Sequence, residues 1–375
     1  MKIEKLTAIL SYIKETFVGK DEIIDILGIG LLAKENAFLL GPPGTAKSAI
    51  IRLLSDCIKD GRNFEYLLTR FTEPNEIFGP FDIRKLKEGE LITNTEGMMP
   101  EASMVFLDEV FNANSAILNS LLMALNEKIF KRGKQKIHLP ALMFVGASNL
   151  LPEDEALHAL LDRFLIRVKC DYVQPDLLKQ VLDAGWKLEK KTVEEKPTIL
   201  PEEIKELQKM CREVELTDIQ QEYVSLIHSL RNTGVNISDR RAVKIQNLIA
   251  ASALICGRKK AILSDLWVLR YIWDTEEQIE IIAGMVNNTL EKEEMNEAHP
   301  QASTDQLPNA EQLAKEVEDL KTKWLDTTTT GEEKNIIKDK LRYIQTRSKW
   351  IKHSEHKTHL NTQIENLWKE MLQTV

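Results

Sequence analysis

A glycine-rich loop between a predicted strand and a predicted helix constrains this chain more than any other feature. The loop, Gly41-Pro-Pro-Gly-Thr-Ala-Lys47-Ser48, follows the apolar run Ala37–Leu40. Strand, loop and helix in this order are typical of a phosphate-binding loop, in which backbone N–H groups and the helix N-terminus attract an anion. The pattern predicts an α/β fold, with the loop beyond the carboxyl end of its strand.

The loop residues have separate expected roles. Lys47 would reach the β- and γ-phosphates of a nucleotide, and Ser48 would ligate Mg²⁺. Ala46 stands where such loops usually have a second glycine; because alanine tolerates positive φ poorly, its β-carbon must find room there. The predicted cofactor-binding residues of the loop are Gly41, Pro42, Pro43, Gly44, Thr45, Ala46, Lys47, Ser48 and Ala49.

A second motif lies about 60 residues downstream, where the apolar run Met104–Leu107 ends in Asp108-Glu109. Asp108 would hold Mg²⁺ through water, and Glu109 would orient and deprotonate the attacking water. An apolar run ending in two acids is common, but its distance from the loop and the strand order make the pair specific. ATP and Mg²⁺ are the expected cofactors, with Ser48 and Asp108 as metal ligands.

Two further positions complete the predicted catalytic set. A third apolar run ends in Ala147-Ser-Asn149, and the Asn149 amide can position the water, although an isolated Asn is more often a turn or cap residue. Arg163 follows a short helix and would reach into a neighbouring subunit's site, where such an arginine contributes roughly 10³–10⁵ in rate. A surface salt bridge with Asp162 is the alternative.

Periodicity divides the chain into three predicted domains. Residues 1–175 alternate helices with strands, beginning with a helical pattern over 1–27 that breaks at Val18-Gly19. Residues 176–285 are helical, and Ser238 caps a helix over 238–256. Residues 286–375 form a helical extension, with a flexible polar loop near 290–310 and two charged helices separated by Asp326–Gly331.

Composition restricts the function further. The 375-residue chain has a net charge of −8, which argues against a large electrostatic nucleic-acid surface. It has no apolar run long enough for a membrane span and no secretion signal at its start. The scattered cysteines indicate reduced thiols, and we expect a cytoplasmic protein. They are Cys57, Cys170, Cys211 and Cys256.

The motifs resemble those of the MoxR branch of AAA+ ATPases. The resemblance is carried by the loop with alanine before its lysine and by the stretch Tyr66–Pro80. Ser238–Val243 and Ala250–Arg258 are similar to the RavA subgroup. The resemblance covers residues 10–285; larger members carry a β-rich domain within the C-terminal helices, where this chain has only the loop near 290–310.

The resemblance implies a parallel AAA+ sheet with helices on both faces, an all-α lid and C-terminal helices. Val18 and Gly19 would border the adenine. Arg240, or failing that Arg241, would be the lid arginine that contacts the γ-phosphate, so that Lys47 and Arg240 hold the same phosphate.

The resemblance also implies two inserted hairpins, Phe81–Thr93 and Glu127–Leu139, which face the central pore in related rings. The second has a basic tip, formed by Lys131, Arg132 and Lys134. This tip would either grip an acidic substrate or be a solvated turn.

The predicted function is that of a ring-forming, hexameric ATPase that remodels or matures client protein complexes. MoxR-like proteins typically act with a partner bearing a von Willebrand factor A domain, which we expect here by resemblance. The alternatives are a nucleic-acid motor and a nucleotide-switched scaffold of low turnover. Glu109, Asn149 and Arg163 are all present, which favours hydrolysis over the scaffold.

Overall fold

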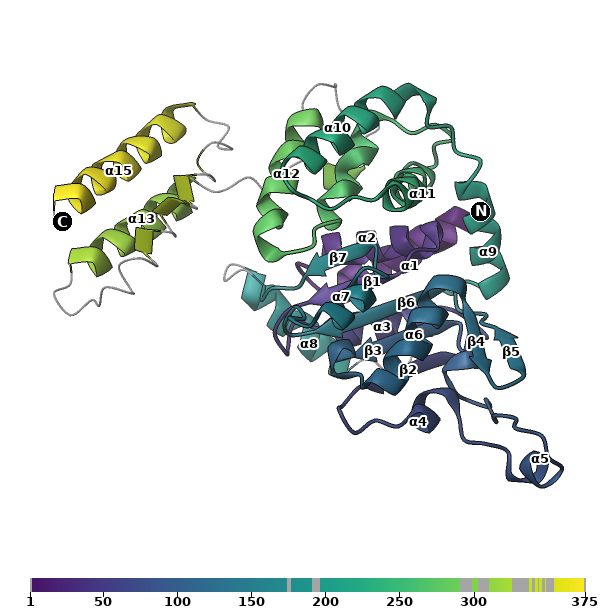
Figure 1. The fold of residues 1–375 in the computed structure, drawn as a ribbon. Helices are drawn as coiled ribbons and strands as arrows, with labels where there is room; N and C mark the ends of the chain where they lie inside the picture. Colours follow the sequence, from purple (N-terminus) through teal and green to yellow (C-terminus); the bar gives the residue numbers. More distant parts are fainter. Residues whose placement is uncertain are drawn as a thin grey trace.

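The computed structural model is built around a five-stranded parallel sheet (Figure 1). The strand order is β2-β3-β6-β1-β7, which places β1 at the interior between β6 and β7. The strands are β1 Ala37–Leu40, β2 Asn63–Leu67, β3 Met104–Asp108, β6 Met143–Ser148 and β7 Ile166–Lys169. Every residue of β1 and β6 is buried, because both faces of the sheet are covered by helices. The predicted strands and their parallel pairing are confirmed.

The structure describes residues 2–173, 177–190, 196–290, 299–302, 310–325, parts of 337–348, and 354–373. The helices of the sheet-containing region are α1 Lys2–Thr16, α2 Asp21–Ala33, α3 Lys47–Asp56, α4 Pro74–Phe78, α5 Ile83–Lys87, α6 Ser115–Glu127 and α7 Glu155–Leu161. Those that follow are α8 Leu178–Lys190, α9 Pro201–Cys211, α10 Gln220–Asn232, α11 Asp239–Ile255, α12 Glu276–Leu290, α13 Ala310–Leu325 and α15 Ser354–Gln373.

The N-terminal helices follow the predicted pattern. The apolar side of α1, with Leu6, Ile9 and Ile13, is fully buried. The break falls at Gly19, whose φ of 71° favours a glycine. The second helix, α2, is buried almost throughout and packs against α9 and α11, so it lies between the sheet and the following helices.

The helices α9–α12 and the 3₁₀ segment η5 (Leu263–Tyr271) form the lid. Among its described residues, the lid contains no named strand, as predicted. Ser238 caps α11 by accepting a hydrogen bond from the backbone N–H of Arg241 at 3.2 Å. Asparagine, serine and aspartate are preferred at this position because their side chains satisfy a free helix N–H group.

The two inserted segments differ from each other. Residues of β4 (Ile129–Arg132) and β5 (Gln135–His138) pair as a regular antiparallel hairpin. The predicted hairpin Phe81–Thr93 is instead a loop that contains α5, closed by a single bridge between its two end residues. Asp82 accepts hydrogen bonds from two backbone N–H groups of α5 and so favours a helical turn over a ladder.

The third region also differs in part from expectation. Within the polar stretch near 290–310, His299 and Ala302 are buried against the lid, and Arg270 donates to the carbonyl groups of Gln301 and Ala302. Helices α13 and α15 form a second hydrophobic cluster of their own (Figure 1). Described residues at 337–338, 341–342 and 344–345 are helical as well, and the predicted divider Asp326–Gly331 lies outside the described residues.

A buried charge cluster joins the sheet to the lid. Arg167 of β7 and Arg241 of α11 share the Oδ1 atom of Asp274, with Arg241 at 2.8 Å. Burial alone would raise the pKa of Asp274, but Arg241 and Arg167 outweigh it and hold the pKa below its ordinary value of 3.8. Burial lowers the pKa of Arg167 to about 10, which still leaves it charged at neutral pH.

We expect Asp274→Asn to lower the free energy of unfolding by about 3–5 kcal/mol, because two buried guanidinium groups would face each other without a carboxylate. Urea unfolding measures this. The pKa of Asp274 is lower in the folded state than in the unfolded state. The difference in unfolding free energy between the variant and wild type should therefore be largest above pH 3.8 and shrink as the pH falls through the folded-state pKa.

The matched control is Asp239→Asn, which removes an ion pair of Arg231 in which the Asp239 side chain is 97% exposed. An equal loss of stability in the two variants would contradict the role given to Asp274.

Candidate nucleotide-binding site

The phosphate-binding loop begins where β1 ends and continues its pairing. The Gly41 N–H donates to the Ser148 carbonyl at 3.1 Å, directly after the register pair Leu40–Ser148. The loop then turns through Gly44 (φ 82°) and Ala46 (φ 67°) into α3. Ala46 adopts a positive φ despite its side chain, and the expected room for its β-carbon is present, because Ala46 packs partly buried against the core.

Lys47 and the loop backbone present donors to the same space. The Lys47 side chain is 8% exposed and donates to the carbonyl groups of Gly41 and of Pro42, the latter at 2.9 Å. Among the described residues, the backbone N–H groups of Gly44 and Thr45 have no hydrogen-bond acceptor. Unused N–H groups, a lysine and a helix N-terminus together form a binding site for phosphate groups.

The two acids lie beside the tip of β6. Asp108 ends β3, and its Oδ1 accepts the Glu109 N–H at 3.0 Å. Glu109 adopts a left-handed conformation with φ 49°. Its carboxylate accepts hydrogen bonds from Asn149 Nδ2 at 2.7 Å and from Ser148 Oγ at 3.4 Å. The structure thus brings the predicted base and the predicted water-positioning amide together.

The segment after β7 forms the wall on the other side of the loop. The Tyr172 hydroxyl donates to the Pro43 carbonyl at 3.4 Å. A β-carbon at Gly19 would approach Val173 within 3.1 Å, so the predicted adenine-bordering pair lies against this segment. Lys20 donates to the Asp171 carbonyl at 2.5 Å, and burial lowers the pKa of Lys20.

Arg163 lies at the opposite end of the strands from the loop. We call this end, where the parallel strands begin, the amino edge of the sheet, and the end beside the loop the carboxyl edge. Its carbonyl accepts a hydrogen bond from Asn36, which directly precedes β1. Its guanidinium forms a salt bridge with Asp162 at 2.7 Å, and Arg163 Nε is buried without a hydrogen-bond partner among the described residues. The alternative salt bridge is therefore present, but an exposed pair of this kind contributes little stability and can open.

The two lid arginines differ in burial. Arg240 is exposed and contacts Asn126, at the end of α6, at 3.3 Å. Arg240 therefore lies at the amino edge as well. The length of β1, about 13 Å, separates this edge from the phosphate-binding loop. Arg241 is 6% exposed and held by Asp274 and two backbone carbonyl groups. Within one chain, the structure does not bring Arg240 to Lys47.

Sequence reasoning missed three groups at the site. Ser148 binds Glu109, and only its position at a strand tip hints at this. Tyr172 follows the carboxyl end of β7, which is also a weak signal. The Cys170 carbonyl backs Gly41 so closely that a β-carbon there would clash. This contact has no signal in the sequence.

The residues present fit a magnesium nucleotide. Lys47 and the loop N–H groups would hold the phosphates. Ser48, in the first turn of α3, and Asp108, at the tip of β3, would supply oxygen ligands of the kind that Mg²⁺ prefers. When bound, the metal would neutralise phosphate charge, while Glu109 would accept a proton from water held with Asn149. Among the described residues, no cluster of three or more His, Cys, Asp or Glu side chains offers another metal site.

Comparisons with known proteins agree with this geometry. Residues 4–209 match the family model described as the MoxR domain in the MoxR-vWA-beta-propeller ternary systems, and residues 208–286 match an AAA lid domain. An uncharacterised protein of Methanocaldococcus jannaschii is 37% identical over 295 residues, covering 77% of this chain and 76% of its own length.

More distant matches agree as well. The chaperone MoxR1 of Mycobacterium tuberculosis is 24% identical over 186 residues, which is 48% of each chain. A solved structure from Cytophaga hutchinsonii, described as a candidate ATPase, superposes with a TM-score of 0.62 at 17% identity. It covers 79% of this chain and 96% of its own and supports the fold alone.

Fold and site together define a P-loop protein of the AAA+ class. The chain belongs to the MoxR family of AAA+ ATPases. Nucleotide binding follows at the level of the family. The RavA subgroup stays a prediction from the sequence.

Two glycines of the loop allow a test of its geometry. We expect Gly44→Ala to lower the free energy of unfolding by about 1–2 kcal/mol, because φ is 82°. The loss should be no larger, since nothing lies within 4 Å of the new β-carbon. Gly41→Ala should cost about 1–3 kcal/mol more, because the β-carbon meets the Cys170 carbonyl. Urea unfolding without nucleotide measures both. A larger loss for Gly44→Ala would show that the loop has another conformation.

Proposed function

We propose that this protein is a ring-forming ATPase that remodels client protein complexes. The observation that carries the proposal is the separation of its catalytic groups. Lys47 and Glu109 lie at the carboxyl edge of the sheet, whereas Arg163 and Arg240 lie at the amino edge of the same chain. A site that needs both sets is complete only when the amino edge of one subunit meets the carboxyl edge of the next.

In this arrangement Arg163 and Arg240 would act on the nucleotide of the neighbouring subunit. That revises the expectation that Lys47 and Arg240 hold one phosphate within a chain. Arg241 remains in its buried cluster with Asp274. Since head-to-tail contacts that close form rings, a hexamer fits the proposal.

An apolar stripe beside the loop supports contact with another subunit. Helix α8 exposes Leu178, Leu182 and Trp186 at intervals of four residues, with exposed fractions of 52%, 65% and 64%. Tyr172, 68% exposed, contacts the phosphate-binding loop through its hydroxyl. Exposed apolar residues in a continuous row are typical of a protein interface.

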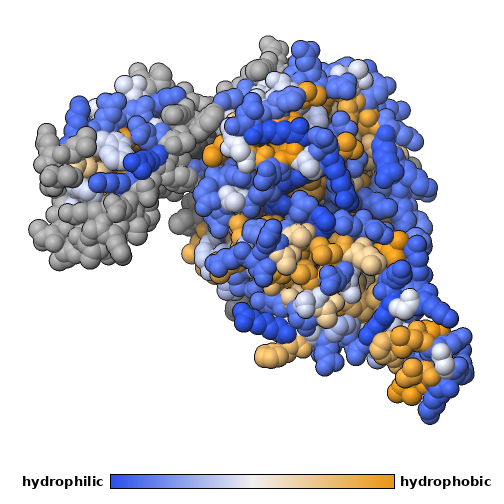
Figure 2. All heavy atoms as spheres, viewed as in Figure 1, coloured by the Kyte–Doolittle hydropathy of each residue, from blue (hydrophilic) through white to orange (hydrophobic). Residues whose placement is uncertain are grey.

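The inserted segments are the proposed contact with client proteins. Arg132 donates to the Gly79 carbonyl and to Asn75, and its guanidinium lies over the Phe81 ring at 3.9 Å. It therefore braces one insert against the other and is not available to an acidic substrate. Figure 2 shows apolar side chains gathered around α5, where the exposed ones are Ile83, Leu86 and Leu91. We propose that this apolar tip contacts clients.

The family description supports a further proposal, a partner with a von Willebrand factor A domain. The similarity to the chaperone MoxR1 supports a role in client maturation. In the described part of the chain, no helix combines the length and apolar character needed to cross a bilayer. We propose a cytoplasmic location.

The roles of Lys47 and Glu109 predict opposite defects. Lys47→Ala should weaken ATP binding about tenfold or more, because a charge-assisted phosphate contact is lost. Glu109→Gln should keep ATP bound while turnover falls by about 10²–10⁴, since the general base is lost. Calorimetry and steady-state phosphate release measure these quantities. Lys59→Ala is the control, because this exposed lysine lies just beyond the end of α3 that is remote from the loop. Equal ATP affinity in the two site variants would contradict the assigned roles.

Mixing two inactive variants tests the shared site. We expect Arg163→Ala and Lys47→Ala each to lose ATPase activity alone, and their mixture to regain part of it. In the mixture, Arg163 of a Lys47→Ala subunit can contact the intact loop of an Arg163→Ala subunit. Arg240→Ala should behave like Arg163→Ala. Light scattering measures the particle size in each sample.

The opposite outcome is an active, monomeric Arg163→Ala protein without recovery on mixing. The site would then be complete within one chain, and a nucleotide-switched scaffold would be the better description.

A further inference from the structure

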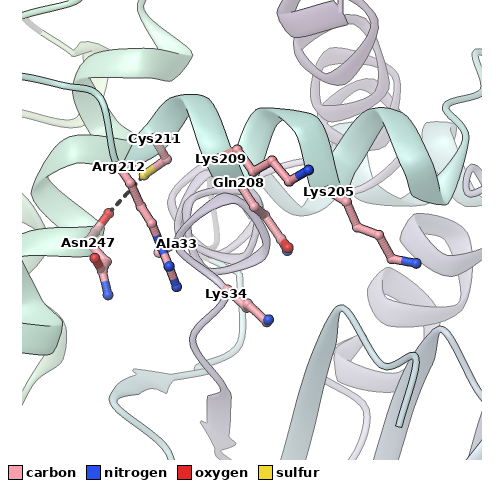
Figure 3. Close-up of a pocket in the computed structure, with 8 residues that line it drawn as sticks. All are labelled: Ala33, Lys34, Lys205, Gln208, Lys209, Cys211, Arg212 and Asn247. Carbon is pink, nitrogen blue, oxygen red and sulfur yellow. Dashed lines mark hydrogen bonds between the residues drawn. The ribbon is translucent and has the colours of Figure 1, made fainter. Parts of the chain in front are cut away.

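A pocket of 330 Å³ lies where the sheet-containing region meets the lid (Figure 3). The end of α2, one face of α9 and one residue of α11 line it. Its volume is within the range of small-molecule sites. The lining residues are Ala33, Lys34, Lys205, Gln208, Lys209, Cys211, Arg212 and Asn247.

Four of these residues are cations, and the described part of the structure gives none of them a carboxylate partner. Lys34, Lys205, Lys209 and Arg212 are all exposed, and no ion pair with an acid within 4.0 Å involves any of them. This concentration of positive charge occurs in a chain whose net charge is −8.

The cations of α9 gather on one face of the helix. Lys205, Lys209 and Arg212 stand at i, i+4 and i+7 on one face, where like charges cost a few tenths of a kcal/mol per pair. Two of the three acids of α9 are paired with α1, Glu203 with Lys5 and Glu206 with Lys2. Lys209 and Arg212 lie at the carboxyl end of α9, where the helix dipole favours cations, but the three cations still repel one another, and an anionic ligand would offset that repulsion.

The other lining groups do not neutralise the pocket. The Gln208 amide, 9% exposed, donates to the Leu31 carbonyl at 2.8 Å. Burial raises the pKa of Cys211 to about 12, so its thiol is uncharged. The neighbouring carboxylate of Glu35 is 6% exposed and is bound by Lys244 at 3.0 Å and by Asn247 at 3.4 Å.

We propose that this pocket binds an oligophosphate anion. Arginine and lysine are the side chains that bind phosphate oxygens best, and four of them match the charge of a pyrophosphate or triphosphate chain. The lining includes no aromatic ring on which a base could stack. The phosphate chain itself is therefore the recognised group, and its source is either a free oligophosphate or the phosphates of a nucleotide.

A bound anion would connect two parts of the molecule. Lys34 directly follows α2, whereas Arg212 and Asn247 belong to the region that matches the AAA lid model. An anion between them would hold the lid on α2. Because it binds the folded arrangement, it would also raise the unfolding temperature in proportion to its saturation.

Calorimetric titration of the full chain carrying Lys47→Ala with pyrophosphate and tripolyphosphate tests the proposal, because the loss of Lys47 weakens phosphate binding at the loop without adding a competing nucleotide. The pocket and control variants are made in the same background. We expect saturable binding near one equivalent. In Lys209→Glu/Arg212→Glu it should weaken at least about tenfold, because two of four cations are reversed. The control Lys59→Glu/Lys259→Glu makes the same charge change at exposed lysines outside the pocket and should bind as the Lys47→Ala protein does. Lys209→Gln/Arg212→Gln is a second variant should the glutamates disturb folding.

A titration with ATP separates the two sources. Binding of ATP at the pocket as tight as that of tripolyphosphate would assign the phosphates of a nucleotide, and a clear preference for tripolyphosphate would assign a free oligophosphate. The proposal is overturned by absence of saturable binding, or by equal binding in the pocket and control variants. It is also overturned if the pocket variant alters only the particle size in light scattering, because the cations would then contact a second copy of the chain. None of these outcomes depends on ATP hydrolysis.

Discussion

The hydrogen bond from the Gly41 N–H to the Ser148 carbonyl is the contact on which the site depends. It extends the β1–β6 pairing by one residue beyond the strand and so fixes the start of the phosphate-binding loop beside the tip of β6. The same tip carries Ser148 and Asn149, which bind the Glu109 carboxylate. The donors for phosphate and the candidate base are thus held by neighbouring strands, whose backbone spacing is set by the sheet.

The amino edge of the sheet is organised by Asn36 in a comparable way. Its buried side chain donates to the carbonyl groups of Leu125 and Arg163 and accepts from Lys128 and the Phe144 N–H. All four hydrogen-bonding positions of the amide are used, which rigidifies the edge. Burial lowers the pKa of Lys128 to about 7, so part of this network can lose its charge near neutral pH. The Arg163 backbone is therefore placed as firmly as the loop at the other edge.

The sequence predicts three of the five strands, β1, β3 and β6, because their information is local, whereas β2 and β7 include charged residues and are not continuous apolar runs. Fully buried parallel strands are continuous apolar runs, and each predicted run is a strand of the sheet. Ala46 could be placed at positive φ because the loop motif demands that conformation. The position of Arg240 could not be predicted from its cap motif, since the lid is held by distant pairs such as Arg241 with Asp274. Ser238 determines where α11 begins, but not where the helix lies.

The contacts of the two inserted segments could not be predicted from the sequence either. A basic run at a hairpin tip predicts either substrate contact or a solvated turn, and both interpretations assume that its cations are free. Arg132 is instead used by Gly79, Asn75 and the ring of Phe81, and Gln135 exchanges two hydrogen bonds with the Thr93 backbone. These contacts tie the base of the first insert to the β4–β5 hairpin. Of the three cations at the basic tip, Arg132 is therefore engaged within the protein, whereas Lys131 and Lys134 are exposed, and only these two keep the choice between substrate contact and a solvated turn.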